Sequence, residues 1–259
     1  SNTNLRQADL DNAKFSNADL TNADLRGANL SNADLSGANL KDTFPSNTNF
    51  SGANLSGINL SGFNFNNINL SGAKFIGANL SHTQLRGANL RGANFLSTDL
   101  SDADFTNANL SRANLSDAQL NNFMLIGMNL SHANFTGASL RHANLSSSDL
   151  SSAKLCYSKL NNANFRHANL VDAQLVEANL TKANLKEANL QGADLTKANL
   201  KEANLQGADL NRANLKEANL QGADLNNTNL TGAKLRYKDL AGAELSNTKL
   251  IYLKQPIYK

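Results

Sequence analysis

Residues 181–200 read TKANL-KEANL-QGADL-TKANL, four copies of a five-residue unit that ends in leucine. The same phase runs from Leu5 to Leu250, where 41 Leu and 8 Phe fill 50 successive fifth positions and Pro45 is the one exception. Alanine stands two residues earlier in 35 of the 50 units, and Asn or Asp usually lies between. The chain is therefore one repeat pattern without a slip in phase.

A period of five fits neither a helix nor an ordinary strand. A helix needs apolar residues three and four positions apart, and a half-buried strand needs them at every second position. Leucine at every fifth position would be spread around a helix, since it advances by about 140° per unit. The pattern instead predicts a backbone that turns a corner every five residues and stacks into coils with Leu and Ala inside.

Units such as Ala23-Asp24-Leu25 and Ala28-Asn29-Leu30 resemble the pentapeptide-repeat family over residues 1–250. The resemblance implies an all-β solenoid, a right-handed quadrilateral β-helix of about 12 coils with four pentapeptides each. It predicts two regions, the pentapeptide-repeat β-helix at 1–250 and a C-terminal capping tail at 251–259. With twenty residues per coil, Asn29, Asn49 and Asn69 would align as a ladder. Their amides are expected to bond along the ladder or to the turn backbone.

Some units depart from the pattern. Pro45 lacks the N–H that a stacked coil would use, so we expect Phe44 to turn inward and residues 43–47 to form a local bulge. Large side chains replace alanine at five inward sites, which we interpret as a bulkier core rather than a ligand pocket. These sites are Ile58, Phe63, Ile68, Phe123 and Met128.

Five side chains at outward positions form the candidate partner-binding face. Ile76 and Leu96 lie twenty residues apart and should stack, as should Cys156 and Val176, with Tyr157 beside them. A linear apolar run would indicate a contact with a partner, whereas small scattered patches are ordinary surface. Both interpretations remain open from the sequence.

The last residues leave the repeat. Tyr252, Leu253, Ile257 and Tyr258 are apolar and are expected to cover the last coil, where core and strand edges would otherwise be exposed. The alternative is that they form a homodimer contact, as C-terminal elements do in some members of the family.

No catalytic, metal-binding or cofactor-binding residue is predicted. The four histidines, His82, His132, His142 and His167, are at outward positions, and His82 and His142 would lie three coils apart, too far to share a metal. No phosphate-binding loop or nucleophile motif is present. The sequence therefore predicts that the protein is not an enzyme and uses no cofactor.

Composition bounds the location and the partners. Cys156 is the single cysteine, so no disulfide forms within the chain, and a reducing, cytoplasmic location is expected. No apolar run approaches the roughly 20 residues of a membrane span. The net charge of +3 comes from interleaved signs, and Arg6, Arg26 and Arg86 form no continuous basic stripe, so direct nucleic-acid binding is not expected.

These features favour a non-catalytic scaffold that presents a rigid surface to a protein partner. Resemblance to bacterial members of the family that confer quinolone resistance offers an alternative, a mimic of DNA that binds DNA gyrase. That mechanism needs a strongly acidic surface, and here Arg6 and Lys14 lie among the N-terminal aspartates. A further alternative is a bacterial effector or a targeting domain of a larger protein.

Overall fold

A tight turn in every pentapeptide bends the backbone in the computed structural model, which describes residues 2–251. When the unit is numbered so that Leu or Phe is the fifth position, the second position is left-handed, with φ of 58° at Lys182 and 69° at Gly192. The third position closes the turn, since Ala183 N donates to Leu180 O at 2.9 Å. Glycine, asparagine and aspartate tolerate positive φ better than other residues, so their frequent use at the second position follows from the turn.

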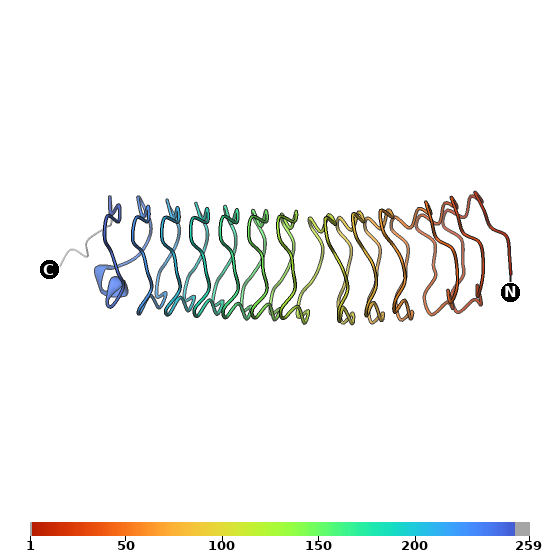
Figure 1. Ribbon diagram of the computed structural model, residues 1–259, viewed down its shortest axis with the longest axis horizontal. Helices are drawn as coiled ribbons and strands as arrows, with labels where there is room; N and C mark the ends of the chain where they lie inside the picture. Colours follow the sequence, from red (N-terminus) through yellow and green to blue (C-terminus); the bar gives the residue numbers. More distant parts are fainter. Residues whose placement is uncertain (1, 252–259) are drawn as a thin grey trace. The chain divides into compact units, whose positions relative to one another are not determined.

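Successive coils stack through parallel β-bridges between residues twenty positions apart, such as Asn184 and Asn204. Leu185 N donates to Asn204 O at 2.7 Å, and Asn204 N donates to Ala183 O at 2.9 Å. Figure 1 shows the coils repeating along the chain. The spacing means that four pentapeptides complete one coil, so the chain is a β-solenoid as the sequence predicts.

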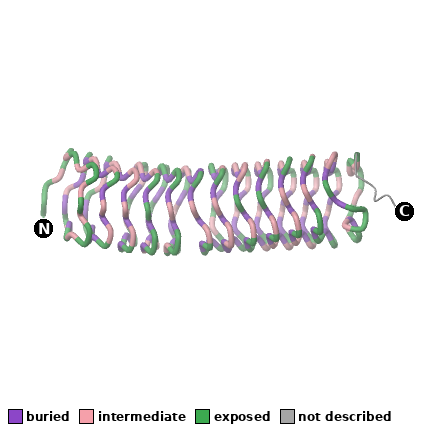
Figure 2. Tube along the Cα trace, turned by 180° about the vertical axis from the view of Figure 1, so that it is seen from behind, coloured by how far each residue is buried: buried purple, intermediate pink, exposed green. Residues whose placement is uncertain are grey.

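The third and fifth positions form the core. Ala183 and Leu185 are both fully buried, and the same holds for most units of the chain. Buried segments therefore recur at regular intervals along the coils in Figure 2. Where phenylalanine replaces leucine the rings also pack together, and those of Phe75 and Phe95 are stacked with centroids 5.2 Å apart. The predicted inward positions are confirmed by this pattern.

The amide ladder is also confirmed. Asn49 Nδ2 donates to Asn29 Oδ1 at 3.0 Å, and Asn69 Nδ2 donates to Asn49 Oδ1 at 2.9 Å. The same oxygen of Asn49 accepts the backbone N–H of Ser51 at 3.1 Å. Each such residue therefore fixes its own turn and ties its coil to the next.

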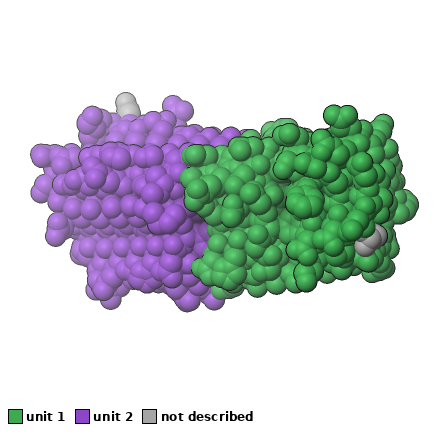
Figure 3. All heavy atoms as spheres, turned by 45° about the vertical axis from the view of Figure 1, so that its right-hand side comes forward, with its two compact units in different colours: residues 1–119 green, residues 120–259 purple. Residues whose placement is uncertain are grey.

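The chain divides into two compact units, Ser1–Gln119 and Leu120–Lys259, coloured separately in Figure 3. Each unit has its own coil-to-coil bridges and its own buried phenylalanines, such as Phe50 in the first and Phe165 in the second. The division at residue 250 stays a prediction. The tail residues Tyr252, Leu253, Ile257 and Tyr258 lie outside the described residues.

Two expectations about large side chains are wrong. Phe44 does not turn inward; its side chain is 56% exposed, and Arg26 Cζ lies 5.9 Å from the ring centroid. The bridge between Asp24 and Phe44 holds Phe44 at a fourth position, which points outward throughout the repeat. Ile58, Ile68 and Met128 are buried as expected, but Phe63 and Phe123 are only half-buried.

One departure was not identified from the sequence. Lys238 stands at an inward third position, where its ammonium group would be costly to bury. The backbone leaves the repeat there as the 3₁₀ helix η1 (Tyr237–Leu240), which exposes Lys238 and returns Leu240 to the core. Arg236 N donates to Asp239 Oδ2 at 2.8 Å, which fixes the start of the helix.

Candidate interaction surfaces

Ile76 and Leu96 form an apolar pair on the first unit. They occupy first positions on adjacent coils and are 38% and 37% exposed. Gly77 N donates to Leu96 O at 3.1 Å, so the two residues stack as predicted. The left-handed turn after each first position holds the side chain outward, where it can touch a partner.

Cys156, Tyr157 and Val176 form a second apolar cluster, on the second unit. Tyr157 N donates to Val176 O at 3.0 Å, and Tyr157 is 58% exposed while Cys156 and Val176 are half-buried. Because the two clusters belong to different units, each is a surface of its own. The idea that they share one face stays a prediction.

Met124 is an exposed apolar residue that was not predicted; it stands at a fourth position, where the repeat usually has Asn or Asp. Met124 is 62% exposed and lies close in sequence to Ile126, which is 50% exposed. The signal in the sequence is an apolar residue at a fourth position, which Met124 shares with Phe44.

Two of the four histidines face an acidic side chain on the adjacent coil. His82 Nδ1 lies 3.6 Å from Asp102 Oδ2, and His167 Nδ1 lies 3.1 Å from Glu187 Oε2, each pair joining adjacent coils. Within residues 2–251, no group of three or more His, Cys, Asp or Glu side chains is arranged to hold a metal ion.

Carboxylates at fourth positions serve the turns. Asp24 accepts hydrogen bonds from Arg26 Nε at 2.8 Å and from Arg26 N at 3.2 Å, and Arg6 Nη1 lies 3.6 Å away. The Arg26 side chain is the main cause that lowers the pKa of Asp24 from its ordinary value of 3.8 to about 2. Hydrogen bonds from Ser16 and Ser36 likewise lower the pKa of Asp34.

We expect part of the acid sensitivity of the protein to come from Asp24. A carboxyl whose pKa is lower in the folded state stabilises the fold above its unfolded pKa, and this contribution disappears as the pH falls. For Asp24 the window runs from about pH 4 down to about 2. Urea unfolding between pH 2 and 5 should show a smaller loss of stability in Asp24→Asn and in Arg26→Gln than in the wild type. Parallel curves for all three proteins would contradict this assignment.

A cleft interrupts the stacking in the first unit, between the coils that contain Pro45 and Phe63. The fourth positions before and after this place are bridged to the next coil. Among the described residues, however, no bridge joins Asn39 to Asn59 or Phe44 to Asn64. The cleft has a volume of about 520 Å³. Ten residues line it: Asn39, Lys41, Asp42, Thr43, Pro45, Asn59, Ser61, Gly62, Phe63 and Asn64.

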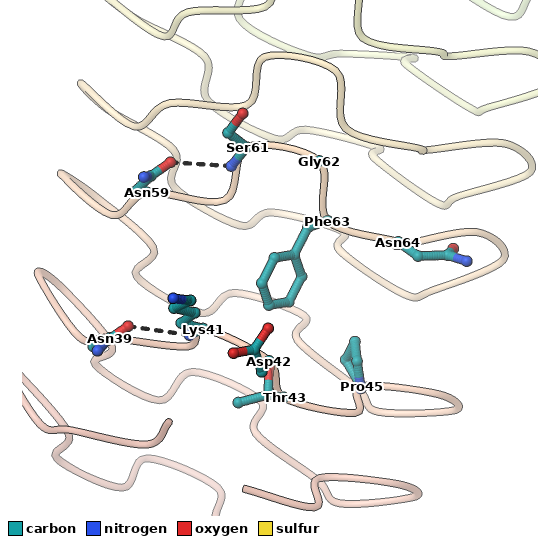
Figure 4. Close-up of a pocket in the computed structure, with 10 residues that line it drawn as sticks. All are labelled: Asn39, Lys41, Asp42, Thr43, Pro45, Asn59, Ser61, Gly62, Phe63 and Asn64. Atoms are coloured by element: carbon teal, nitrogen blue, oxygen red, sulfur yellow. Dashed lines mark hydrogen bonds between the residues drawn. The ribbon is translucent and has the colours of Figure 1, made fainter. Parts of the chain in front are cut away.

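Two sequence features account for the cleft. Pro45 has no N–H for the hydrogen bond that a leucine would donate to Asn64 O in the next coil. Phe63 replaces an alanine, and Figure 4 shows its ring extending toward Asp42 and Thr43 of the preceding coil. Phe63 therefore lines this cleft and does not lie wholly in the core, whereas the choice against a ligand pocket stays a prediction.

Pro45→Leu should close the cleft on one side and stabilise the first unit. Replacing the rigid proline raises the conformational entropy of the unfolded chain, which lowers the free energy of unfolding by up to about 1 kcal/mol. The change restores a donor worth about 1 kcal/mol and a leucine whose burial contributes about 2 kcal/mol. We expect the free energy of unfolding, measured in urea, to rise by about 1–2 kcal/mol. Hydrogen exchange should also become slower at the amide of Leu40, which ends the pentapeptide before that of residue 45. Lower stability, with Leu40 exchange unchanged, would show that Pro45 does not hold the cleft open.

None of the helical structure in residues 2–251 has the length and hydrophobicity of a membrane-spanning segment.

Comparisons with known proteins agree with the repeat. A family model described as pentapeptide repeats matches in 8 copies, in overlapping segments from residues 1–27 to 223–253. The chain is 35% identical to HetL, a pentapeptide repeat protein involved in heterocyst differentiation regulation in the cyanobacterium Nostoc sp. strain PCC 7120, over 78% of this chain and 86% of HetL, with a TM-score of 0.45.

Two further solved structures are similar. Rfr23 from the cyanobacterium Cyanothece 51142 is 30% identical over 54% of this chain and 88% of its own, with a TM-score of 0.27. QnrB1, a plasmid-mediated fluoroquinolone resistance protein, is 21% identical over 79% of this chain and 94% of its own, with a TM-score of 0.38. The search of curated proteins finds no match. With the family model matching along almost its whole length, the chain belongs to the pentapeptide-repeat family.

Proposed function

We propose that the protein is a non-catalytic scaffold that presents a regular β-helical surface to a protein partner. The observation that carries the proposal is the exposed pair Ile76 and Leu96 on a backbone held rigidly from coil to coil. Preformed apolar groups on a rigid support lose little entropy on binding, which favours association. We also propose the finer architecture, a right-handed quadrilateral β-helix of about 12 coils, and a cytoplasmic location.

The electrostatics support a role without catalysis. General acid–base catalysis is most efficient when the catalytic pKa lies near the operating pH, which for a carboxyl at neutral pH means a raised pKa. Every carboxyl in residues 2–251 whose pKa is shifted has a lowered value, among them Asp11, Asp99 and Asp104. In these three groups the leading cause that lowers the pKa is a hydrogen bond from a Ser or Thr hydroxyl, which comes from the same turn for Asp99 and Asp104 and from the next coil for Asp11.

Crosslinking capture from the source cells tests the scaffold proposal, with mass spectrometry of the captured partner. The double variant Ile76→Ser/Leu96→Ser should lose the partner that the wild type captures. Val171→Ser is the matched control, because Val171 is a half-buried apolar residue at the same position of its pentapeptide on the other unit. Equal capture by all three proteins would overturn the assignment of this pair.

The second cluster is a further candidate surface for the same function. Cys156→Ser/Val176→Ser, assayed in the same way, separates a partner that contacts the second unit from one that contacts the first. Loss of capture in both double variants, with Val171→Ser unaffected, would support one partner that spans both units.

Two further contacts predicted from the sequence can be tested directly in solution. We propose a homodimer contact through Tyr252, Leu253, Ile257 and Tyr258. The masses of the full chain and of a chain ending at residue 250, measured by light scattering, should then differ by about twofold.

The net charge of +3 does not support the alternative of a DNA mimic that binds gyrase. Inhibition of gyrase supercoiling by the purified protein would restore it and replace the scaffold proposal.

A further inference from the structure

The cleft beside Phe63 is lined by backbone groups that pair with the next coil elsewhere in the repeat. On one edge, among the described residues, no protein group accepts from the N–H groups of Leu40 and Asp42 or donates to the carbonyl of Thr43. On the facing edge the same is true of the N–H and carbonyl groups of Asn59 and Asn64. Both edges therefore present alternating donors and acceptors, as the open edge of a β-sheet does.

Side chains give the cleft a mixed character. Phe63 is half-buried and supplies an apolar wall with Pro45, while Lys41 and Asp42 bring opposite charges to the rim. Asn59 Oδ1 accepts the N–H of Ser61 at 3.1 Å, which leaves its Nδ2 group to donate. A ligand in this site must therefore offer both donors and acceptors together with a small apolar group.

We propose that the cleft binds a short extended peptide segment of a protein partner, which adds as a strand between the two coils. A peptide backbone carries N–H and C=O groups at the spacing of the coil edges, which is the basis of strand addition to an open sheet edge. Its side chain on the Phe63 side would be apolar and would pack against the ring. An anionic ligand such as a phosphate is disfavoured because Asp42 stands beside Lys41 on the rim.

The edges limit the length of the segment. In the coil that contains Pro45, residues 38–40 and 43–45 form the two sides next to the cleft. The turn at Lys41 and Asp42 lies between them. A straight strand can follow one side only, so the cleft recognises about three residues of extended chain, at the spacing of about 3.3 Å per residue. Peptide binding in the cleft rests on the proposed function only for the class of partner, a protein. It does not depend on the apolar pair, since Ile76 and Leu96 do not line the cleft.

Selection from a phage library of random heptapeptides against the full chain tests the proposal, with Pro45→Leu protein used for counter-selection. A selected synthetic peptide should slow hydrogen exchange on the side that it follows, either at Leu40 and Asn59 or at Asn64. Phe63→Ala should weaken its binding about tenfold or more, because an apolar anchor of the site is lost. Phe123→Ala is the matched control, since Phe123 is also half-buried at a third position, and should bind as the wild type does.

Several results would overturn the proposal. The library could yield no peptide that survives counter-selection, the selected peptides could bind equally well to Phe63→Ala, or they could leave Leu40, Asn59 and Asn64 all unprotected. Binding of saccharides in a glycan array, with no selected peptide, would also reject it in favour of a sugar site. Peptide binding by Ile76→Ser/Leu96→Ser distinguishes the two proposals, because that variant should lose the captured partner of the apolar pair and keep the peptide.

Discussion

Replacing Phe165 by alanine should lower the free energy of unfolding of the second unit by about 3–5 kcal/mol. Phe165 is fully buried, and bridges of Asn164 to Asn144 and Asn184 place Leu145 and Leu185 above and below it. Removing the ring leaves a cavity between two coils whose backbones are tied together, so the site can collapse only in part. Urea unfolding followed by circular dichroism measures the change.

Phe165→Leu is the matched control for this prediction. Leucine is the residue that the adjacent coils use in the same column, so the change should cost less than about 1.5 kcal/mol. In a solenoid each coil contacts only its neighbours, so hydrogen exchange in Phe165→Ala should rise most at the adjacent coils. Equal losses in both variants would show that Phe165 is not packed in the column described.

Asn49→Ala should cost about 2–4 kcal/mol, because one amide makes three hydrogen bonds. Asn49 Nδ2 donates to Asn29 Oδ1, and Asn49 Oδ1 accepts from Asn69 Nδ2 and from Ser51 N. Each bond contributes about 0.5–1.5 kcal/mol, and the loss leaves donors of two neighbouring residues without their acceptor. Thermal and urea unfolding of the purified variant give the value.

Asn49→Asp separates the roles of the two amide atoms. Aspartate keeps the acceptor for Ser51 N and for Asn69 Nδ2, as Asp209 does when it accepts from Asn211 N and Asn229 Nδ2 at 3.0 Å each. It lacks only the donor toward Asn29, so we expect less than half of the loss seen with alanine. A loss as large as that of Asn49→Ala would mean that the donor toward Asn29, rather than the acceptor, supplies most of the stabilisation.

The periodic part of the fold could be predicted from the sequence because one solution is repeated many times. The burial of Ala183 and Leu185 follows from a pattern that every unit shares, so an error in one unit is corrected by the others. The amide ladder follows from the same repetition once twenty residues are assigned to a coil. That number came from the resemblance to the family, and the bridges confirm it within each unit.

The departures could not be predicted because each occurs once and has competing outcomes of similar energy. Phe63 could enlarge the core or stand between two coils, and the sequence does not weigh the loss of coil-to-coil hydrogen bonds against overpacking. Phe44 could exchange places with Pro45, but the bridge to Asp24 keeps it outside. Lys238 was missed because the local backbone changes to η1 to expose it.

The candidate surfaces were predicted in part. The stacking of Ile76 on Leu96 and the contact between the backbones of Tyr157 and Val176 follow from the twenty-residue spacing. The cleft beside Phe63 lies elsewhere. Pro45 and Phe63 could be recognised as departures from the repeat, but the loss of the coil-to-coil hydrogen bonds of Leu40 and Asn59 does not follow from the side-chain pattern.

All of these surfaces depend on one register, and disulfide crosslinking measures it directly. In a chain with Cys156→Ser, the pair Lys154→Cys and Gln174→Cys should oxidise readily, because these exposed residues are bridged on adjacent coils. Stacked strands lie about 4.8 Å apart, within the range that a disulfide spans. Pairing Lys154→Cys with Asn169→Cys or Asn179→Cys, fifteen or twenty-five residues away, should give no crosslink. Efficient crosslinking of either of these control pairs, with none between 154 and 174, would contradict the account.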